Sequence, residues 1–327
     1  MLVPVLLFVL GLILLVKGGD WFVDGATGIA HRFHIPELLI GATVVSIGTT
    51  LPEVMVSAAS AVSGHGEMAY GNAIGSIICN TALIAAITVA VRPSKVDAKS
   101  LRLPVVFFFL SAAFYAVVAY VLGYFNRWVG LVLLGIFLIY MVLSVRQTRR
   151  VPAPAPTLEH LKESSETDSM AALFKEVVLL VVGAALIAVG ADLLVDNGTL
   201  IAAALGVPEA VIALTIVSLG TSLPELVTAI TSLAKGHSAL SLGNVIGANL
   251  FNLVLVSGVS VTLSPFAVPV SKHLFGINKS LLIDIPLMLF VMVLLTLPTI
   301  KRGKLARAQG IALLTIYAAF CILQFVV

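Results

Sequence analysis

The sequence predicts an all-α polytopic membrane protein with ten transmembrane helices arranged as two inverted five-helix repeats. Three observations carry this prediction: the composition, ten apolar segments, and an internal match at a fixed offset. Of the 327 residues, 60% are hydrophobic and only 11% are charged, whereas a soluble domain carries about 25% charged residues. Runs such as VVFFFL and LVLLGIFLIY lack the apolar and polar alternation of membrane strands, so the spans are expected to be helical.

The apolar segments recur from one end of the chain to the other. A helix needs roughly 20 residues to cross a hydrocarbon core of about 30 Å. The first span continues past Lys17 with no basic residue ahead of it, so we expect it to be retained rather than cleaved as a signal peptide. The predicted spans are residues 2–30, 37–63, 68–91, 103–122, 128–145, 173–203, 209–234, 239–264, 281–298 and 308–326.

One polar stretch divides the hydrophobic segments into two groups of five. RRVPAPAPTLEHLKESSETDS is rich in proline, serine and charge, which is typical of a tether between folded units. The predicted organisation is a first five-helix repeat at 1–146, a linker at 147–172 and a second five-helix repeat at 173–327.

The two groups are related by duplication. Residues 11–80 align without a gap to residues 183–252 at an offset of 172, and about 28 of the 70 positions are identical. The identities include glycine, proline, asparagine and glutamate, which lipid-facing helices do not share by composition alone. Because each group has an odd number of spans, the second copy must enter the membrane upside down. Transporters of this design bind their substrate near the midplane, where the repeats meet.

Basic residues predict the orientation, because cytoplasmic loops are enriched in lysine and arginine. Fifteen of the 19 Lys and Arg residues fall on the first, third, fifth, seventh and ninth connections. We therefore expect both termini to lie outside and the 147–172 linker to be cytoplasmic.

The strongest chemical signal is S-x-G-T-[TS]-L-P-E, which occurs at 46–53 and again at 218–225. Glycine and proline loosen a helix, so carbonyl groups near Ser46 are expected to become free acceptors. A carboxylate at this depth is costly, and it typically faces the bundle interior on an ion or proton pathway. Two such carboxylates related by the inverted repeat are expected to converge. A neutral, hydrogen-bonded glutamate would not explain why hydroxyls, glycine and proline accompany it twice. The oxygen-bearing side chains are Thr49, Thr50 and Glu53 in one copy and Thr221, Ser222 and Glu225 in the other.

A second motif, G-N-x-[IV]-G, opens residues 71–80 and 243–252. Its polar residues are four apart and so share one helical face, and its glycines follow the small-xxx-small pattern of close packing. The last asparagine of each copy is a candidate ligand, with hydrogen bonding between helices as the alternative. The polar positions are Asn72, Ser76 and Asn80, matched by Asn244, Ala248 and Asn252.

These donors are all oxygens, which suits hard cations. Ca2+ accepts six to eight such ligands in flexible geometry, and no cluster of Cys and His suggests zinc or copper. Two carboxylates balance one Ca2+ or two Na+ ions, so the two ions can compete for one site, which is the basis of exchange. No cofactor is expected beyond the transported ions, and Cys79 and Cys321 are interpreted as packing residues.

The two motifs resemble the alpha-repeats of the cation/Ca2+ antiporter superfamily, and the pattern is closest to the prokaryotic sodium/calcium exchangers. The alpha-1 motif covers 41–80 and the alpha-2 motif covers 213–252. The resemblance implies a ten-helix exchanger of the prokaryotic cell membrane whose first and sixth spans slide against the rest. It carries ion coordination over to Glu53, Thr49, Thr50, Ser76, Asn80, Glu225, Thr221 and Ser222, with backbone carbonyl ligands at Ser46 and Ser218.

The sequence departs from that family pattern at two positions. Many members have an acid where Asn252 stands and a serine where Ala248 stands. A neutral amide lowers the negative charge of the site, and alanine removes a hydroxyl. The number of ions per cycle could therefore differ from that of relatives.

Several alternatives to Na+/Ca2+ antiport remain open from the sequence. Proton-coupled relatives usually carry Gly-Asn rather than the Gly-Thr found here before the acid, which disfavours H+/Ca2+ antiport. Exchange of Mg2+ or Mn2+, and passive conduction through a cation channel, are further candidates. An enzyme is not expected, because no nucleophile and base pair accompanies the acids. We expect no nucleic acid and no obligatory protein partner, only the ions and the lipid bilayer.

Overall fold

The computed structural model describes residues 2–148, 170–205, 220–269, 273–274 and 277–326. Most of the predicted linker, the start of the seventh predicted span and Ser218 lie outside these residues. The helices are α1 (Leu2–Arg32), α2 (Glu37–Ile40), α3 (Ser46–Val62), α4 (Gly66–Cys79), α5 (Ala86–Val91), α6 (Ala98–Val117), α7 (Arg127–Thr148), α9 (Met170–Ala204), α12 (Leu223–Ala234), α13 (Ser238–Phe251), α14 (Ser257–Leu263), α15 (Ile285–Arg302) and α16 (Arg307–Val326).

In the part of the chain that the structure describes, five π-helical turns join or extend these helices and merge several of them into longer continuous helices. The π-helical turns are Gly41–Val45, Asn80–Ala85, Val118–Leu122, Asn252–Val256 and Ser280–Asp284. Within the described residues, eight continuous helices are long and apolar enough to cross a membrane, and two shorter apolar helices accompany them, Leu223–Ala234 and Arg307–Leu323. These ten segments match the ten predicted spans, which confirms the polytopic all-α fold.

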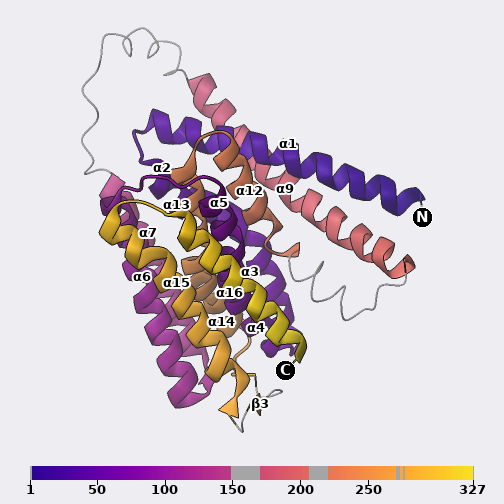
Figure 1. Cartoon of the computed structure of the whole chain (residues 1–327), viewed down its shortest axis with the longest axis vertical. Coiled ribbons are helices and arrows are strands. Elements are labelled where there is room, and N and C mark those ends of the chain that lie inside the picture. The colour runs from indigo at the N-terminus through magenta and orange to yellow at the C-terminus, as the bar shows by residue number, and fades with distance from the viewer. Residues whose placement is uncertain (1, 149–169, 206–219, 270–272, 275–276, 327) are drawn as a thin grey trace.

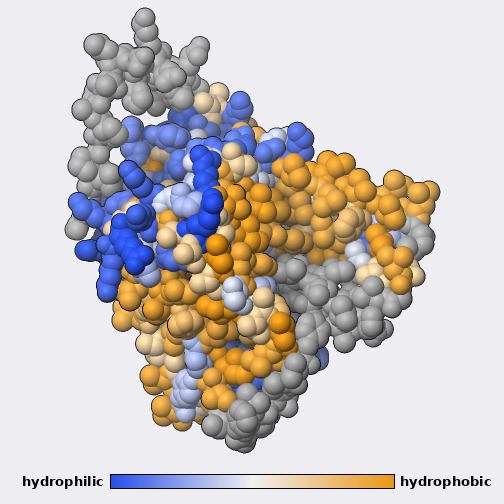
Figure 2. Space-filling model, in the orientation of Figure 1, coloured by the Kyte–Doolittle hydropathy of each residue, from blue (hydrophilic) through white to orange (hydrophobic). Residues whose placement is uncertain are grey.

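Short strand pairs and hydrogen bonds fix the two ends of the bundle. At one end β1 (Tyr124–Phe125) pairs antiparallel with β2 (Phe266–Ala267). The same end carries the β3 (His273–Leu274) and β4 (Ile277–Asn278) pair. At the opposite end the third and ninth connections meet, where the Val96 amide donates to Gly303 O at 2.9 Å. The third and ninth connections thus lie at the end opposite the fourth and eighth, as expected for a ten-span chain. Figure 2 shows hydrophilic residues gathered around one end, above a largely hydrophobic surface.

Helices α1 and α9 lie side by side and run obliquely across the bundle (Figure 1). Glycines at matched positions let their backbones approach closely. A Cβ at Gly11 would lie 2.9 Å from Gly190 O, and one at Gly18 would lie 2.9 Å from Gly183 O. Because these positions tolerate no side chain, α1 and α9 form one closely packed pair of helices.

At one end, ion pairs link α1 to α9 and link α1 to the residue that follows α12. Arg32 Nε lies 3.0 Å from Glu176 Oε2, which joins the end of α1 to the start of α9. Lys235, which follows α12, lies 2.7 Å from Asp24 Oδ1 and 3.5 Å from Asp20 Oδ1 on α1. Both aspartates of α1 therefore form ion pairs with a lysine of the second repeat.

The N-terminus of α6 has a defined cap. Asp97 accepts hydrogen bonds from the amides of Lys99 and Ser100 at 3.0 and 3.2 Å and from the Ser100 hydroxyl at 2.6 Å. Partial burial acts to raise the pKa of Asp97, but these hydrogen bonds and the Lys99 charge outweigh it. The pKa of Asp97 is therefore lowered from its usual value.

Aromatic side chains fill the core between α4, α6 and the β1 and β2 pair. Tyr115 and Phe125 have ring centroids 4.5 Å apart, and Tyr70 lies 5.9 Å from Tyr115. This cluster packs α6 and the β1 and β2 pair against α4. It thereby supports the helix that carries Asn72, Ser76 and Asn80.

Candidate ion-binding site

Glu53 and Glu225 are both fully buried, at 0% exposure. Glu53 lies within α3 of the first repeat, and Glu225 lies in the first turn of α12 of the second. The two carboxyl groups are close enough to interact electrostatically, and the Thr50 hydroxyl lies 3.5 Å from Glu225 Oε1. The predicted convergence of the two glutamates is present in the structure.

The helix around each glutamate differs between the repeats. Helix α3 continues through Gly48 and Pro52, and the widened turn lies earlier, at Gly41–Val45. The widened turn thus ends directly before Ser46, where free carbonyl groups are expected from the sequence. In the second copy Thr221 and Ser222 form a turn, and α12 begins at Leu223. Proline lacks a backbone N–H, so the Gly48 carbonyl four residues before Pro52 loses its usual helical partner.

Two π-helical turns begin at equivalent asparagines of the two repeats. Asn80 opens the turn Asn80–Ala85, and Asn252 opens Asn252–Val256. Such turns recur at functional sites because the wider ring disrupts the ordinary hydrogen-bond ladder. The Ser257 hydroxyl donates to Asn252 O at 3.0 Å, much as the Ser46 hydroxyl donates to Gly41 O at 2.7 Å. No sequence signal had predicted these turns.

Polar atoms without partners concentrate at this place. Among the described residues, both carboxylate oxygens of Glu53 lack a hydrogen-bond partner. The amide oxygen and nitrogen of Asn80 and of Asn252 lack one as well. Glu225 Oε2 is likewise unpartnered. Because a buried polar atom without a partner costs free energy, these oxygens are suited to binding a cation.

The donor set indicates which kind of cation fits. The described residues contain no group of three or more His, Cys, Asp and Glu side chains that could hold a metal. The site instead combines two carboxylates with neutral amide and hydroxyl oxygens. These donors fit Ca2+ or Na+ rather than a transition metal.

The threonine hydroxyls of the motif bond to the opposite repeat. Thr49 Oγ1 donates to Asn244 Oδ1 at 3.2 Å, and Thr221 Oγ1 donates to Asn72 Oδ1 at 3.4 Å. Neither asparagine is predicted from the sequence to contact these threonines. Their place at equal offsets in the repeated G-N motif was the available signal.

The remaining predicted ligands lie nearby in the same helices. Ser76 on α4 and Ser222 before α12 are buried, at 4% and 2% exposure. The Ser46 hydroxyl is engaged by Gly41 O and by Asn244 O, at 2.7 and 2.9 Å. Its carbonyl oxygen is contacted by the Thr49 hydroxyl at 3.5 Å. The backbone carbonyl of Ser46, a predicted ligand, therefore lies beside the hydroxyl of Thr49, a second predicted ligand.

Glycines let the two repeats approach around the site. A Cβ at Gly243 would clash with the Leu38 carbonyl, and one at Gly247 would clash with the Ser46 hydroxyl and the Ala42 backbone. The glycines of the second G-N motif thus permit contact between α13 and the segment that leads into α3. This contact holds Asn244 against Ser46 and Thr49.

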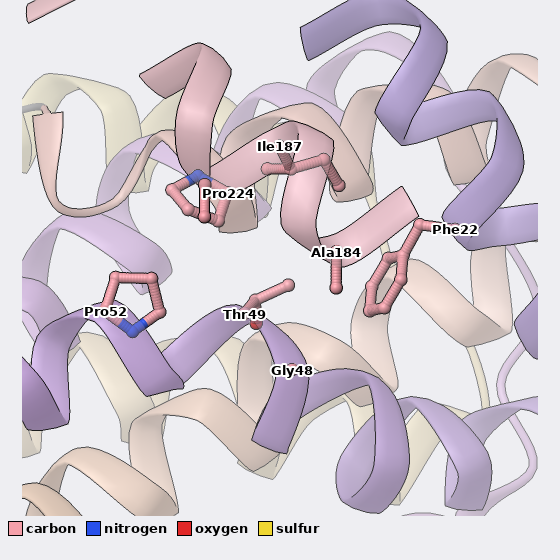
Figure 3. Close-up of a pocket in the computed structure, with 8 residues that line it drawn as sticks. Phe22, Gly48, Thr49, Pro52, Ala184, Ile187 and Pro224 are labelled. Atoms are coloured by element: carbon pink, nitrogen blue, oxygen red, sulfur yellow. The ribbon is translucent and has the colours of Figure 1, made fainter. Parts of the chain in front are cut away.

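A small cavity of about 10 Å3 lies between the motif helices and the α1 and α9 pair. It is lined by Phe22, Gly48, Thr49, Pro52, Ala184, Ile187, Ala188 and Pro224. Figure 3 shows the equivalent prolines Pro52 and Pro224 on one side of the cavity and Phe22 with Ala184 on the other. The two long helices therefore face the two duplicated motifs directly.

Comparison with known proteins places this arrangement in context. The family described as "Sodium/calcium exchanger protein" matches residues 3–146 and 175–326. The sodium/calcium exchanger MaX1 of Methanosarcina acetivorans is 29% identical over 98% of both chains. The putative antiporter CaxA of Alkalimonas amylolytica is 31% identical over 99% of both, and the uncharacterized membrane protein MJ0091 of Methanocaldococcus jannaschii is 35% identical over 95% of this chain and 94% of its own.

Solved structures share the fold across nearly the whole chain. A structure of the sodium-calcium exchanger NCX_Mj, soaked with 100 mM Na+ and 10 mM Sr2+, superposes with a TM-score of 0.81. It is 32% identical, and the match covers 97% of each chain. A second structure of that exchanger, soaked with 10 mM Na+ and no Ca2+, gives a TM-score of 0.80 over the same coverage.

Proposed function

The chain belongs to the sodium/calcium exchanger protein family, and from this we propose that it is a secondary antiporter that exchanges Ca2+ for Na+ by alternating access. The observation that carries the proposal is the pair of fully buried glutamates, Glu53 and Glu225, one from each repeat. Their unpartnered oxygens lie deep in a bundle of apolar helices. A buried acid of this kind marks an ion pathway.

Charge balance supports competition between the two ions. The two carboxylates supply a charge of minus two when both are ionised, while Asn80 and Asn252 are neutral. One Ca2+ or two Na+ ions would neutralise this charge. Bound Ca2+ therefore disfavours binding of Na+, and bound Na+ disfavours binding of Ca2+. This competition allows the two ions to be exchanged.

Each candidate ligand has a proposed role in the site. Glu53 and Glu225 supply the carboxylates, and Asn80 and Asn252 supply amide oxygens that the structure leaves unpartnered. The hydroxyls of Thr49, Thr50, Ser76, Thr221 and Ser222 and the carbonyls of Ser46 and Ser218 complete the proposed set. No cofactor or enzymatic step is part of this proposal.

We propose that the α1 and α9 pair moves as a unit to alternate access. Its close glycine contacts bind the two helices to one another, and it lies against the motif helices around the small cavity. The proposed organisation is a repeat at 1–146, a linker at 147–172 and a repeat at 173–327. The excess of basic residues supports a cytoplasmic linker and external termini.

The proposal is tested with purified protein in lipid vesicles loaded with Na+. Dilution into Na+-free buffer should drive uptake of 45Ca2+, and dilution into equal Na+ should not. Uptake that ignores the Na+ gradient but follows an imposed pH gradient would show H+/Ca2+ antiport instead. Uptake without any counter-ion gradient, at rates far above carrier turnover, would show a channel. Competition by Mg2+ or Mn2+ measures the selectivity among divalent ions.

A further inference from the structure

Two asparagines outside the proposed ligand set bond to threonines within it. Asn244 on α13 accepts from Thr49 on α3 at 3.2 Å, and Asn72 on α4 accepts from Thr221 at 3.4 Å. Position 221 is position 49 plus the repeat offset of 172, and position 244 is position 72 plus the same offset. The same contact therefore occurs twice, each time across the boundary between the repeats.

We propose that Asn72 and Asn244 are positioning residues that orient the hydroxyls of Thr221 and Thr49 toward the transported ion. The inference rests on the proposed exchange function and deepens it. A hydroxyl has one proton and two acceptor lone pairs. When an amide oxygen takes the proton, the proton points away from the ion and a lone pair remains for it. The asparagines thus act through the threonines.

The two contacts are supported differently. The Asn72 amide nitrogen donates to the Ser57 hydroxyl at 2.8 Å, which fixes the side chain with its oxygen toward Thr221. Asn244 is fully buried, and its backbone oxygen also accepts from Ser46 at 2.9 Å. The position equivalent to Ser57 is Ala229, so the second repeat lacks this hydroxyl. The Asn72 side chain is therefore held by a partner that Asn244 does not have.

Asn249 provides a matched control on the same helix as Asn244. It is also fully buried, but its amide nitrogen donates to Thr81 at 2.7 Å and to Met292 Sδ at 3.2 Å. Neither partner is a proposed ligand. Loss of Asn249 also removes a buried hydrogen bond between an asparagine amide and a threonine hydroxyl, but this threonine does not belong to the proposed site.

The test measures half-saturating concentrations of Na+ and Ca2+ for transport, and 45Ca2+ binding to the detergent-purified protein. The variants are Asn244→Leu, Thr49→Val, the double variant, and Asn249→Leu. A single hydrogen bond contributes about 0.5–1.5 kcal/mol, so we expect Asn244→Leu to weaken binding about two- to tenfold. The ion whose affinity decreases should be the same in Asn244→Leu and in Thr49→Val. The double variant should bind that ion no more weakly than Thr49→Val does. Asn249→Leu should stay within about twofold of the wild type.

Several outcomes would overturn the inference. One is that Asn244→Leu binds both ions as the wild type does. Another is that the effects of Asn244→Leu and Thr49→Val multiply in the double variant. If Asn244→Leu does not yield a single folded species, the pair Asn72→Leu and Thr221→Val decides by the same criteria, because Asn72 is only half-buried. A wild type without Na+-driven uptake would refute the exchange function, whereas the binding measurements would still test the asparagines.

Discussion

The hydroxyl of Thr50 in the first repeat lies 3.5 Å from Oε1 of Glu225 in the second repeat. A residue of each duplicated motif therefore contacts the other copy inside the site, and neither repeat forms the site alone. Ion binding should depend on both halves at once.

Glu53→Gln and Glu225→Gln should each abolish Na+-driven 45Ca2+ uptake. Each change removes one of two buried carboxylates and leaves a neutral amide of similar size, so a single negative charge remains for a divalent ion. The variants should still purify as single species of wild-type size. Glu67→Gln is the control, because Glu67 is an exposed acid in the first turn of α4, and it should transport normally. Near-normal uptake by either site variant would remove that glutamate from the site.

Asn252→Asp should change the ion or pH dependence of transport without abolishing it. The substitution adds a third carboxylate where the structure has an unpartnered amide, so the site gains an acid that can bind a proton. The expected result is a 45Ca2+ uptake that depends more steeply on pH than in the wild type. An unchanged profile would indicate that Asn252 only joins helices. Asn80→Asp tests the equivalent position in the first repeat.

Gly18→Ala should destabilise the protein in detergent. The added Cβ would lie 2.9 Å from the Gly183 carbonyl and from Leu186, and overpacking of this kind typically costs 1–3 kcal/mol. Gly135→Ala on α7 is the control, since no described atom beyond the adjacent residues and the nearby backbone of its own helix lies within 4 Å of the added Cβ. Thermal unfolding should show a lower midpoint for Gly18→Ala and an unchanged or higher one for Gly135→Ala. Equal midpoints would contradict close packing of α1 on α9.

Asp97→Ala should destabilise the start of α6 by about 1 kcal/mol, the usual effect of losing a helix cap. Because the pKa of Asp97 is lowered in the folded state, its ionised form stabilises the fold above its unfolded pKa of about 3.9. This contribution is lost as the pH falls through the lower, folded pKa. Denaturation at pH 7 should therefore separate Asp97→Ala from the wild type, and the difference should shrink in acid. A difference that does not depend on pH would contradict this account.

The sequence predicted the spans and the convergence of the glutamates because both follow from strong local signals. Apolar length marks the helices, and the offset of 172 residues pairs Glu53 with Glu225. It did not predict that Asn244 contacts Thr49, since that contact depends on how α13 packs against α3. The π-helical turns at Asn80 and Asn252 were also missed, because no residue type distinguishes them from ordinary helix. The close pairing of α1 and α9 does have a sequence signal. Gly11, Gly18 and Gly25 are seven residues apart and so lie on one face of α1.

The ion pairs between Lys235 and α1 occur in only one repeat. The equivalent position in the other repeat is Ser63, although Asp192 and Asp196 match Asp20 and Asp24. If the α1 and α9 pair moves, the access state seen in this structure has these ion pairs. The opposite state cannot form equivalent ion pairs, because Ser63 replaces the lysine. Partly exposed ion pairs each contribute up to about 1 kcal/mol, which is enough to make the two states unequally populated. A single site would then show different apparent affinities from the two faces of the membrane, because apparent affinity scales with the fraction of molecules open to that face.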